Sequence, residues 1–450
     1  MSEVGLDELI TAAAAISVID ATPVSLCVEY VPLTDADGRV LAADVLADRD
    51  YPVFEKALMD GYAVRAADTT AGRLKAVGEV AAGGQHRAAL GAGECVAIMT
   101  GAPLPPGADS VVPIERTRRD GDVVLLEGPI RCGASVAPRA ADSAAGRLLL
   151  ARGTRLGPAQ LAVCAQVGVA APAVFARPRV GILSSGDEIV PFDAEPTGTQ
   201  LRNSNTPLLA SLVRRYGGDV VDLGHVRDDP AAIAERLSTG GLDAILVTGG
   251  MSMGVYDYTP RVMRDLGYEL AITKLKIKPG KPFVFARRAA DHTSEPNSTN
   301  PAAGVNPRAT DADSKIETVA ARVHTRGSYP TSVKPVDAAP APTPFIFGLP
   351  GNPVSAFVCT VRLASRLLLR LGGASPEPQW TTATLGHYLP PNGPREFYQP
   401  TVIEAGTARV LAWNGSADLF TLAQANALLP RRTDEPQLPS GTSVTLIRLP

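Results

Sequence analysis

The sequence predicts a multidomain α/β and β protein whose α/β domain has three layers and a parallel-rich sheet. Its 450 residues are typical of about three domains. Within 177–373, short apolar runs alternate with helix-length segments, as they do when helices cover a parallel sheet. The segments 49–139 and 374–450 contain short alternating runs instead, which favour a small β lobe and a C-terminal β-barrel or β-sandwich.

The segments 1–48 and 140–176 resemble each other in their short polar and helical stretches, so the β lobe is predicted to be inserted into a domain that both form. The elements expected in this domain are helices at 6–16, 35–45 and 158–168 and a strand at 24–31. In the β lobe, Asp60 and Thr100 each stand directly before a glycine. Such positions suit either close approach of a ligand or a hairpin turn, and both alternatives stay open.

Strands and helices alternate along the predicted α/β domain. The expected strands are 180–183, 219–223, 244–247, 270–275, 283–286 and 345–347. The expected helices begin near 205, 230 and 259, and a long apolar helix covers 353–371. The segment 287–344 has no lasting periodicity and is rich in Ala, Thr, Ser and Pro, which predicts a disordered insertion.

The stretch 243–257 combines a buried strand with a glycine-containing loop. Gly249 and Gly250 end the strand, and Ser252 and Gly254 follow before the next helix. Such a loop lets a ligand lie against bare backbone N–H groups, and a helix start favours an anion. Asp257 would repel that anion unless a cation bridges them. The alternative is an ordinary surface loop after a core strand.

Polar residues are expected to collect at one edge of the sheet, because loops after parallel strands share one rim. These residues are Asp187, Glu188, Asp228, Asp229, Lys278, Lys281 and the segment 349–353. Lysines suit a multiply charged oxyanion, and carboxylates suit Mg²⁺ bound to phosphate. Each residue alone fits an ordinary turn, but the set favours a binding site.

Composition argues against several other classes. Forty-three basic and 46 acidic residues give a formal charge of −3, without the basic excess of a nucleic-acid or membrane-surface binder. No apolar run reaches the roughly 20 residues that span a membrane, and the N-terminus lacks the pattern of a signal peptide, so a cytoplasmic location is expected. Cysteine and histidine spacings predict neither a zinc site nor a disulfide framework.

Seven phrases, in this order along the chain, resemble those of the molybdopterin molybdenumtransferase (MoeA) family, to which the C-terminal part of gephyrin is related. They lie at 59–64, 99–103, 185–188, 202–205, 248–254, 278–282 and 349–353. The resemblance implies a homodimer in which each subunit has an elongated linking domain (1–48 and 140–176), an inserted β lobe (49–139), a molybdopterin-binding α/β domain (177–373) and a C-terminal β-barrel (374–450). It places the active cleft between the α/β domain of one subunit and the β lobe of the other.

The implied reaction inserts molybdate into adenylylated molybdopterin and releases AMP, with Mg²⁺ assisting. The resemblance implies these active-site positions: Asp60, Thr100, Asp142, Glu188, Asp228 and Asp257. For the pterin and adenylate it implies Thr248, Gly249, Gly250, Ser252, Gly254, Pro350, Gly351, Asn352 and Pro353. For molybdate it implies Lys278, Lys281, Arg395 and Ser416. For the metal it implies Asp187, Glu188, Asp228 and Asp257.

The sequence departs from the family pattern at 55–57, 140–141, Val255, 398–400 and 417–418. These departures leave open a weakened paralogue that acts as a pterin-binding or scaffold protein, or an enzyme with a changed oxyanion preference such as tungstate. Molybdopterin adenylyltransferase, whose fold resembles the α/β domain, is a further alternative. As partners, the resemblance implies an adenylyltransferase and recipient molybdoenzymes.

Overall fold

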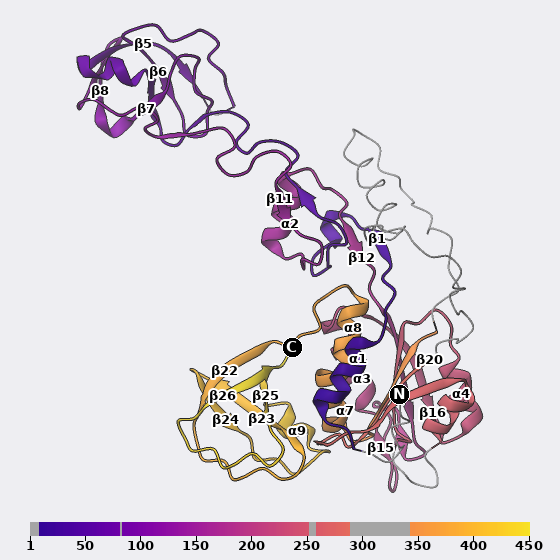
Figure 1. Ribbon diagram of the computed structural model, residues 1–450. Helices are drawn as coiled ribbons and strands as arrows, with labels where there is room; N and C mark the ends of the chain where they lie inside the picture. Colours follow the sequence, from indigo (N-terminus) through magenta and orange to yellow (C-terminus); the bar gives the residue numbers. More distant parts are fainter. Residues whose placement is uncertain (1–8, 82, 252–257, 289–342) are drawn as a thin grey trace, which may run out of the picture.

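The computed structural model describes residues 9–81, 83–251, 258–288 and 343–450. The molecule is elongated, with the β lobe at one end and a narrow linking domain in the middle (Figure 1). The α/β domain and the C-terminal domain lie side by side at the other end. In the described part, no helix is long and apolar enough to cross a membrane. The predicted insertion at 287–344 falls mostly outside the described residues.

A six-stranded sheet forms the centre of the α/β domain in the described part of the chain, in the order β16-β13-β17-β21-β20-β18. Its strands are β13 (Arg179–Ser185), β16 (Asp219–Val226), β17 (Ala244–Thr248), β18 (Tyr268–Lys274), β20 (Pro282–Arg288) and β21 (Phe345–Leu349). The first four strands in the sheet order are parallel, whereas β20 and β18 are antiparallel to their neighbours. The prediction of a parallel-rich sheet is therefore confirmed.

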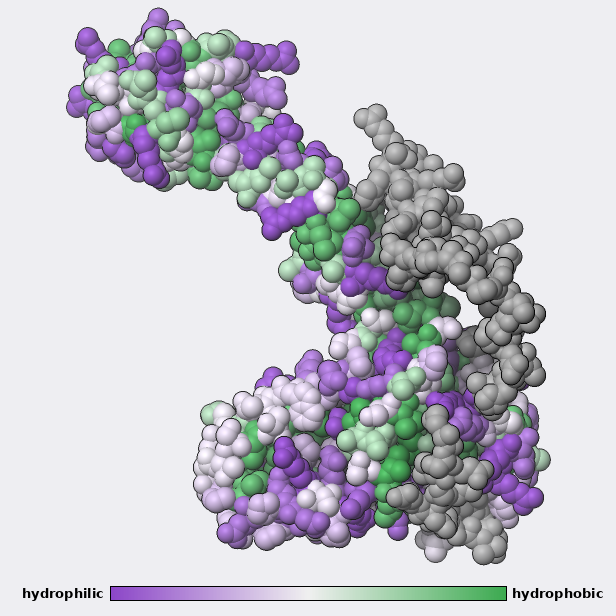
Figure 2. Space-filling view, viewed as in Figure 1, coloured by the Kyte–Doolittle hydropathy of each residue, from purple (hydrophilic) through white to green (hydrophobic). Residues whose placement is uncertain are grey.

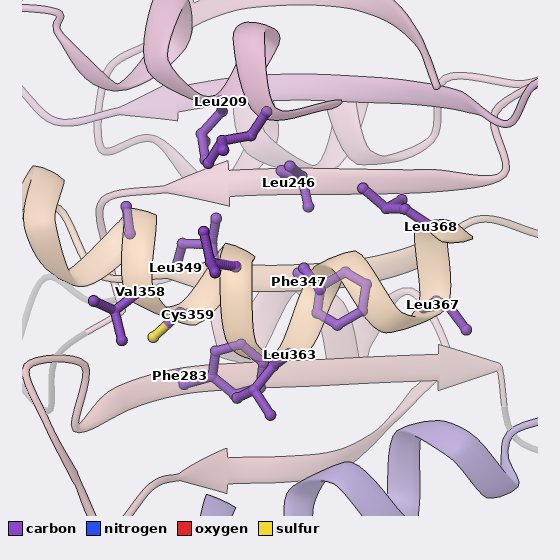
Figure 3. Packing of buried hydrophobic residues seen from close by; sticks show 14 of the residues in the cluster. Leu209, Leu246, Phe283, Phe347, Leu349, Val358, Cys359, Leu363, Leu367 and Leu368 are labelled. Atoms are coloured by element: carbon purple, nitrogen blue, oxygen red, sulfur yellow. The ribbon is translucent and has the colours of Figure 1, made fainter. Parts of the chain in front are cut away.

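Helices cover both faces of this sheet and form two separate cores. The larger core packs α1 (Ala12–Ala21), α3 (Asn205–Arg215), α7 (Pro353–Cys359), a π-helical turn (Thr360–Ala364) and α8 (Ser365–Leu371) against one face. Figure 3 shows Phe283, Phe347 and Leu349 of the sheet beside Val358 and Leu363 of the helical segment. The other face is covered by α4 (Pro230–Leu237) and α5 (Thr259–Asp265). These strand and helix assignments agree with the sequence prediction to within a few residues.

An ion-pair cluster around the buried Arg366 joins the N-terminal helix to the α/β domain. The guanidinium of Arg366, whose side chain is 5% exposed, donates to Asp20 of α1 at 2.6 Å and to Glu377 at 2.9 Å. Arg370 donates to the carbonyls of Ile19 and Thr22, both at 2.7 Å. Because these carbonyls lie at the end of α1, the two arginines fix that helix against α8.

The linking domain contains two short antiparallel pairs and one helix. Strand β1 (Val28–Tyr30) pairs with β12 (Ala173–Phe175), and β2 (Val45–Leu46) pairs with β11 (Leu148–Leu150). The predicted helix at 158–168 is observed as α2 (Pro158–Gln166). Segments that are more than 140 residues apart in the sequence, at 28–30 and 173–175, thus meet in one domain, as the inserted lobe requires.

Two predictions for the N-terminal segment are wrong. The helix expected at 6–16 is α1, which begins after Thr11 because the Thr11 side chain accepts a hydrogen bond from the N–H of Ala14. The helix expected at 35–45 is only a short 3₁₀ turn, Leu33–Asp35. Beyond it, Val40 and Leu41 form isolated antiparallel bridges with Arg155 and Val174. Tertiary pairing therefore overrides the helical preference of this segment.

The β lobe is a single curled sheet in the order β7-β4-β6-β5-β9-β8. Its strands are β4 (Gly61–Val64), β5 (Arg73–Val80), β6 (Glu94–Ile98), β7 (Ser110–Pro113), β8 (Thr117–Asp120) and β9 (Val123–Leu126). Strands β3 (Lys56–Ala57) and β10 (Val136–Ala137) pair where the chain enters and leaves the lobe. The lobe is therefore held by chain segments that run close together at its base.

The C-terminal domain is a closed β-barrel, because β23 pairs with both β24 and β25. Its strands are β22 (Trp380–Leu385), β23 (Glu396–Glu404), β24 (Thr407–Val410), β25 (Ala427–Arg431) and β26 (Ser443–Arg448). A short helix, α9 (Leu419–Leu422), lies between β24 and β25. The strand β19 (Ile277–Lys278) of the α/β domain adds to β23 and connects the two domains.

Candidate functional site

A cavity of about 950 Å³ lies at the carboxyl ends of the parallel strands, between the α/β domain and the barrel. Its walls come from the loops after β13, β17 and β21, from the loop that leads into β20, and from the barrel segment before and within α9. The position agrees with the rule that open α/β sheets bind ligands beyond the carboxyl ends of their strands. Strand β20 is antiparallel, so its first residues reach the same rim.

The glycine loop after β17 approaches its neighbour too closely for a side chain. Gly249 has φ +95°, and a Cβ there would lie 2.1 Å from the carbonyl oxygen of Ser185. Gly250 also has a positive φ, of +59°. Thr248, Gly249 and Gly250 all line the cavity; Thr248 is buried and the two glycines are half-buried. The predicted residues Ser252, Gly254 and Asp257 lie outside the described residues.

If this loop binds the pterin, as the family resemblance implies, the substitution Gly249→Ala is expected to weaken that binding about tenfold or more, because the loop has to shift by roughly 1 Å to relieve the contact with Ser185. Titration of tryptophan fluorescence with molybdopterin measures this loss, since Trp413 lines the cavity. Gly121→Ala is the matched control: its φ is +59° and a Cβ there would meet nothing within 4 Å. Equal affinity of the two variants would contradict the steric argument.

The loop that begins α7 ties three parts of the site together. The side-chain amide of Asn205 donates to the Gly351 carbonyl at 2.7 Å, and that of Asn352 donates to the Ser416 hydroxyl at 2.9 Å. The N–H of Val354 donates to the Ser416 carbonyl at 3.0 Å. The predicted residues Pro350 to Pro353 all line the cavity. The barrel residue Ser416 is thereby fixed against the predicted pterin loop.

The four predicted molybdate residues, Lys278, Lys281, Arg395 and Ser416, all line this cavity. The ammonium of Lys278 lies 4.6 Å from the centre of the Phe397 ring, which holds it by a cation–π interaction. In the described part of the chain, no carboxylate forms an ion pair with these two lysines or with Arg395. Three unneutralised cations on one wall favour a multiply charged oxyanion.

Two other predicted residues lie in the β lobe, across the linking domain from the cavity (Figure 1). The N–H and the hydroxyl of Thr100 both donate to one carboxylate oxygen of Asp60 at 2.7 Å. These two hydrogen bonds, the side-chain one first, hold the pKa of the Asp60 carboxyl below its usual value, so it stays ionised. Asp142 lies at the linking domain, where its N–H donates to the Tyr51 carbonyl.

The predicted metal ligands are only partly brought together. Glu188 lines the cavity, whereas Asp187 and Asp228 do not. Asp257 lies outside the described residues. Among the residues that the structure describes, no group of three or more His, Cys, Asp or Glu side chains is placed to hold a metal ion. Mg²⁺ usually takes one or two protein carboxylates together with substrate phosphate, and Glu188 is the described carboxylate that would contribute to such a site.

Sequence reasoning assigned no role to several residues of the cavity wall. Asn203 and Asn205 stand in one of the family phrases, which is the signal that singles them out. The Oδ1 atom of Asn205 is buried without a partner in the described structure. Trp413 and Phe420 come from the barrel, and the ring of Phe420 is 87% exposed at the cavity wall. Nothing in the sequence pattern indicates that either aromatic residue reaches the site.

Comparison with known proteins identifies two family regions. Residues 10–168 match the MoeA N-terminal region (domain I and II), and residues 181–370 match a probable molybdopterin binding domain. A molybdopterin molybdenumtransferase of Nostoc is 30% identical over 94% of this chain and 89% of its own length. Molybdopterin molybdenumtransferase 2 of Mycobacterium tuberculosis is 30% identical over 92% of this chain and 93% of its own length.

The same comparison with solved structures gives a likeness over nearly the whole chain. Two crystal structures of a molybdopterin biosynthesis MoeA protein from Pyrococcus horikoshii are 28% and 25% identical to this chain, with TM-scores of 0.74 and 0.73. Each match covers 98% of this chain and at least 99% of the other. The inserted lobe, linking domain, α/β domain and barrel are thus one shared architecture.

Proposed function

The chain belongs to the molybdopterin molybdenumtransferase family, and we propose that it inserts molybdate into adenylylated molybdopterin with release of AMP. The observation that supports this reaction most is the cavity itself. Three cations that form no ion pair in the described part of the chain line it together with a glycine loop and the loop at 350–353. One wall therefore suits an oxyanion and the opposite loops suit a phosphate-bearing pterin.

The residues of this chain would act mainly by binding and orienting the two substrates. Lys278, Lys281 and Arg395 would offset the negative charge of molybdate, which otherwise repels the anionic pterin substrate. The Ser416 hydroxyl, already hydrogen-bonded to Asn352, is positioned to contact an oxygen of the same anion. Backbone N–H groups of the glycine loop would bind the adenylate phosphate. Holding both substrates in one cavity turns their encounter into a step within one complex.

The same proposal includes a homodimer in which the β lobe of the partner subunit closes the cavity. Asp60 and Thr100 belong to the β lobe, at one end of the elongated molecule, and the cavity lies at the other end (Figure 1). A single subunit therefore does not bring them together. The linking domain also exposes large apolar side chains, those of Leu26, Val28, Leu46 and Leu148. Figure 2 shows apolar surface along this domain and over α1. Contiguous exposed apolar surface is typical of an interface.

The finer predictions of a Mg²⁺ ion, a cytoplasmic location and exchange with an adenylyltransferase and recipient molybdoenzymes belong to this proposal and rest on the family resemblance. Of the predicted metal ligands, Glu188 is the one that lines the cavity. Mg²⁺ would supply positive charge at the adenylate phosphate. No step above depends on that ion.

Purified protein is expected to release AMP from adenylylated molybdopterin at a rate that rises with molybdate. The double substitution Lys278→Ala/Lys281→Ala should reduce this rate about a hundredfold or more, since each lysine is a charged donor to the oxyanion. Lys276→Ala is the matched control, because Lys276 is close in sequence but does not line the cavity. Pterin binding without AMP release would instead favour a pterin-binding or scaffold protein.

A further inference from the structure

A second cavity, of about 130 Å³, lies at the joint between the linking domain and the α/β domain. The linking domain contributes the segments around Gly38 and Phe175, and the α/β domain contributes the ends of α3 and α8. Among the described residues, its walls carry arginines and no acidic side chain. The arginines of this joint cavity are Arg39, Arg155, Arg177, Arg214 and Arg215.

Three of these arginines are held in place by neighbours. Arg39 is 8% exposed, donates to the Phe175 carbonyl at 2.8 Å and pairs with Glu29. Arg155 donates to the Gly38 carbonyl at 2.8 Å. Arg177 lies 3.8 Å from a carboxylate oxygen of Asp219. The hydrogen bonds of Arg39 and Arg155 therefore position their guanidinium groups before any ligand arrives, whereas the contact of Arg177 joins two exposed side chains and is weaker.

The other two arginines, Arg214 and Arg215, end α3 and form no ion pair in the described part of the chain. Arginine at a helix C-terminus is common, because each helix end carries about half a negative charge. Here the ends of α3 and α8 meet the cavity, and Glu29 and Asp219 lie nearby. Even so, the five guanidinium charges exceed the two carboxylates and two helix ends by about two elementary charges.

We propose that the joint cavity binds a tetrahedral oxyanion of the phosphate type, separate from the molybdate site. Its volume of about 130 Å³ is far below the 950 Å³ of the large cavity, which suits a small oxyanion better than a whole pterin nucleotide. The excess of positive charge favours an anion over a neutral or cationic ligand. Guanidinium groups recognise such oxyanions through paired N–H donors.

The occupied cavity would connect the two domains that form its walls. Arg39 and Arg155 belong to the linking domain, Arg177 stands where the chain passes from that domain into the α/β domain, and Arg214 and Arg215 belong to the α/β domain. An anion bound by both sets reduces the repulsion between them and fixes the angle at which the linking domain leaves the α/β domain. Binding at this cavity would therefore stabilise the orientation of the β lobe without contacting the substrate.

Calorimetric titration tests the proposal if the molybdate site is disabled first. The Lys278→Ala/Lys281→Ala protein is titrated with inorganic phosphate, and separately with molybdate and 5′-AMP, at low ionic strength. We expect one phosphate site per chain, whose affinity falls about tenfold or more when Arg214→Gln/Arg215→Gln is added. AMP binding that is tighter than phosphate binding and is lost in the Arg214→Gln/Arg215→Gln protein would show that the joint cavity takes a phosphate ester whose remainder lies outside it, whereas AMP binding that these substitutions leave unchanged belongs to the adenylate site of the large cavity. Preference for molybdate would identify a second site for the substrate.

The matched control is Arg236→Gln in the same background, because Arg236 also stands in the last turn of a helix but lies away from the cavity. Its phosphate affinity should stay unchanged. If the double arginine variant does not fold, Arg155→Gln serves as the test instead, because it replaces a single exposed side chain of the cavity and should also weaken phosphate binding. The proposal is wrong if the lysine-substituted protein binds none of the three anions, or if Arg236→Gln weakens binding as much as the cavity variants.

Discussion

A mixed dimer of one Asp60→Ala subunit and one Lys281→Ala subunit is expected to keep about half of the wild-type rate of AMP release. Each variant alone should lose about a hundredfold or more. Asp60 lies in the β lobe, and Lys281 lines the cavity at the opposite end of the molecule. If the partner's lobe completes each cleft, the cleft of the Asp60→Ala subunit keeps its own Lys281. It also receives an intact Asp60 from the lobe of the Lys281→Ala subunit. The other cleft carries both substitutions.

The control places both substitutions in one chain and pairs it with a wild-type subunit. In the proposed arrangement, each cleft of that dimer lacks one residue, so its activity should be as low as that of the single variants. An arrangement within one chain gives the opposite pair of results: half activity for this dimer and none for the first. Dimers purified through two different affinity tags, one on each subunit, allow the two rates to be compared directly.

The sheet of the α/β domain was predictable because its strands are short apolar runs with clear stops. Local sequence signals predict the strand before Gly249 and the helix between Asn205 and Gly217, and the structure has both elements at those places. The segment at 35–45 failed for the opposite reason. Its bridges to Arg155 and Val174 depend on residues more than a hundred positions away, which no local pattern records.

The rim of the site was predictable in part from topology. Glu188, the glycine loop and the loop at 350–353 follow parallel strands, so they had to share one edge. Lys278 and Lys281 reach that edge for a different reason, because the strand that follows them is antiparallel. Strand β20 is buried at consecutive residues as the parallel strands are, so its apolar run does not reveal that it is antiparallel.

The barrel side of the cavity shows where sequence reasoning ends. Trp413 and Phe420 reach the site only because the barrel packs beside the α/β domain, with β19 adding to β23. The pattern of short strands predicted a barrel but gave no relation between that barrel and the sheet. The family resemblance supplied Arg395 and Ser416, whereas the two aromatic residues required the structure.

The substitution Phe347→Ala is expected to destabilise the α/β domain by about 3–5 kcal/mol. The ring of Phe347 is fully buried on the central part of the sheet, with its centre 4.9 Å from that of Phe285 and 6.1 Å from that of Phe283. Its removal leaves a cavity under the helical layer that the rigid sheet does not fill (Figure 3).

Such a loss is a large fraction of the roughly 5–15 kcal/mol that stabilises a typical domain, so much of this domain should unfold at moderate urea concentration. Urea denaturation followed by far-ultraviolet circular dichroism measures the change. Phe420→Ala removes the same group from a position that is 87% exposed, and should change stability by no more than about 0.5 kcal/mol. Equal shifts in the two variants would mean that the packing of Phe347 against Phe283 and Phe285 does not hold the helical layer on the sheet. A loss of stability in Phe347→Ala alone would show that this core supports the strand ends that carry the cavity loops. Strand β21 packs in that core and ends at Leu349, directly before the loop at 350–353.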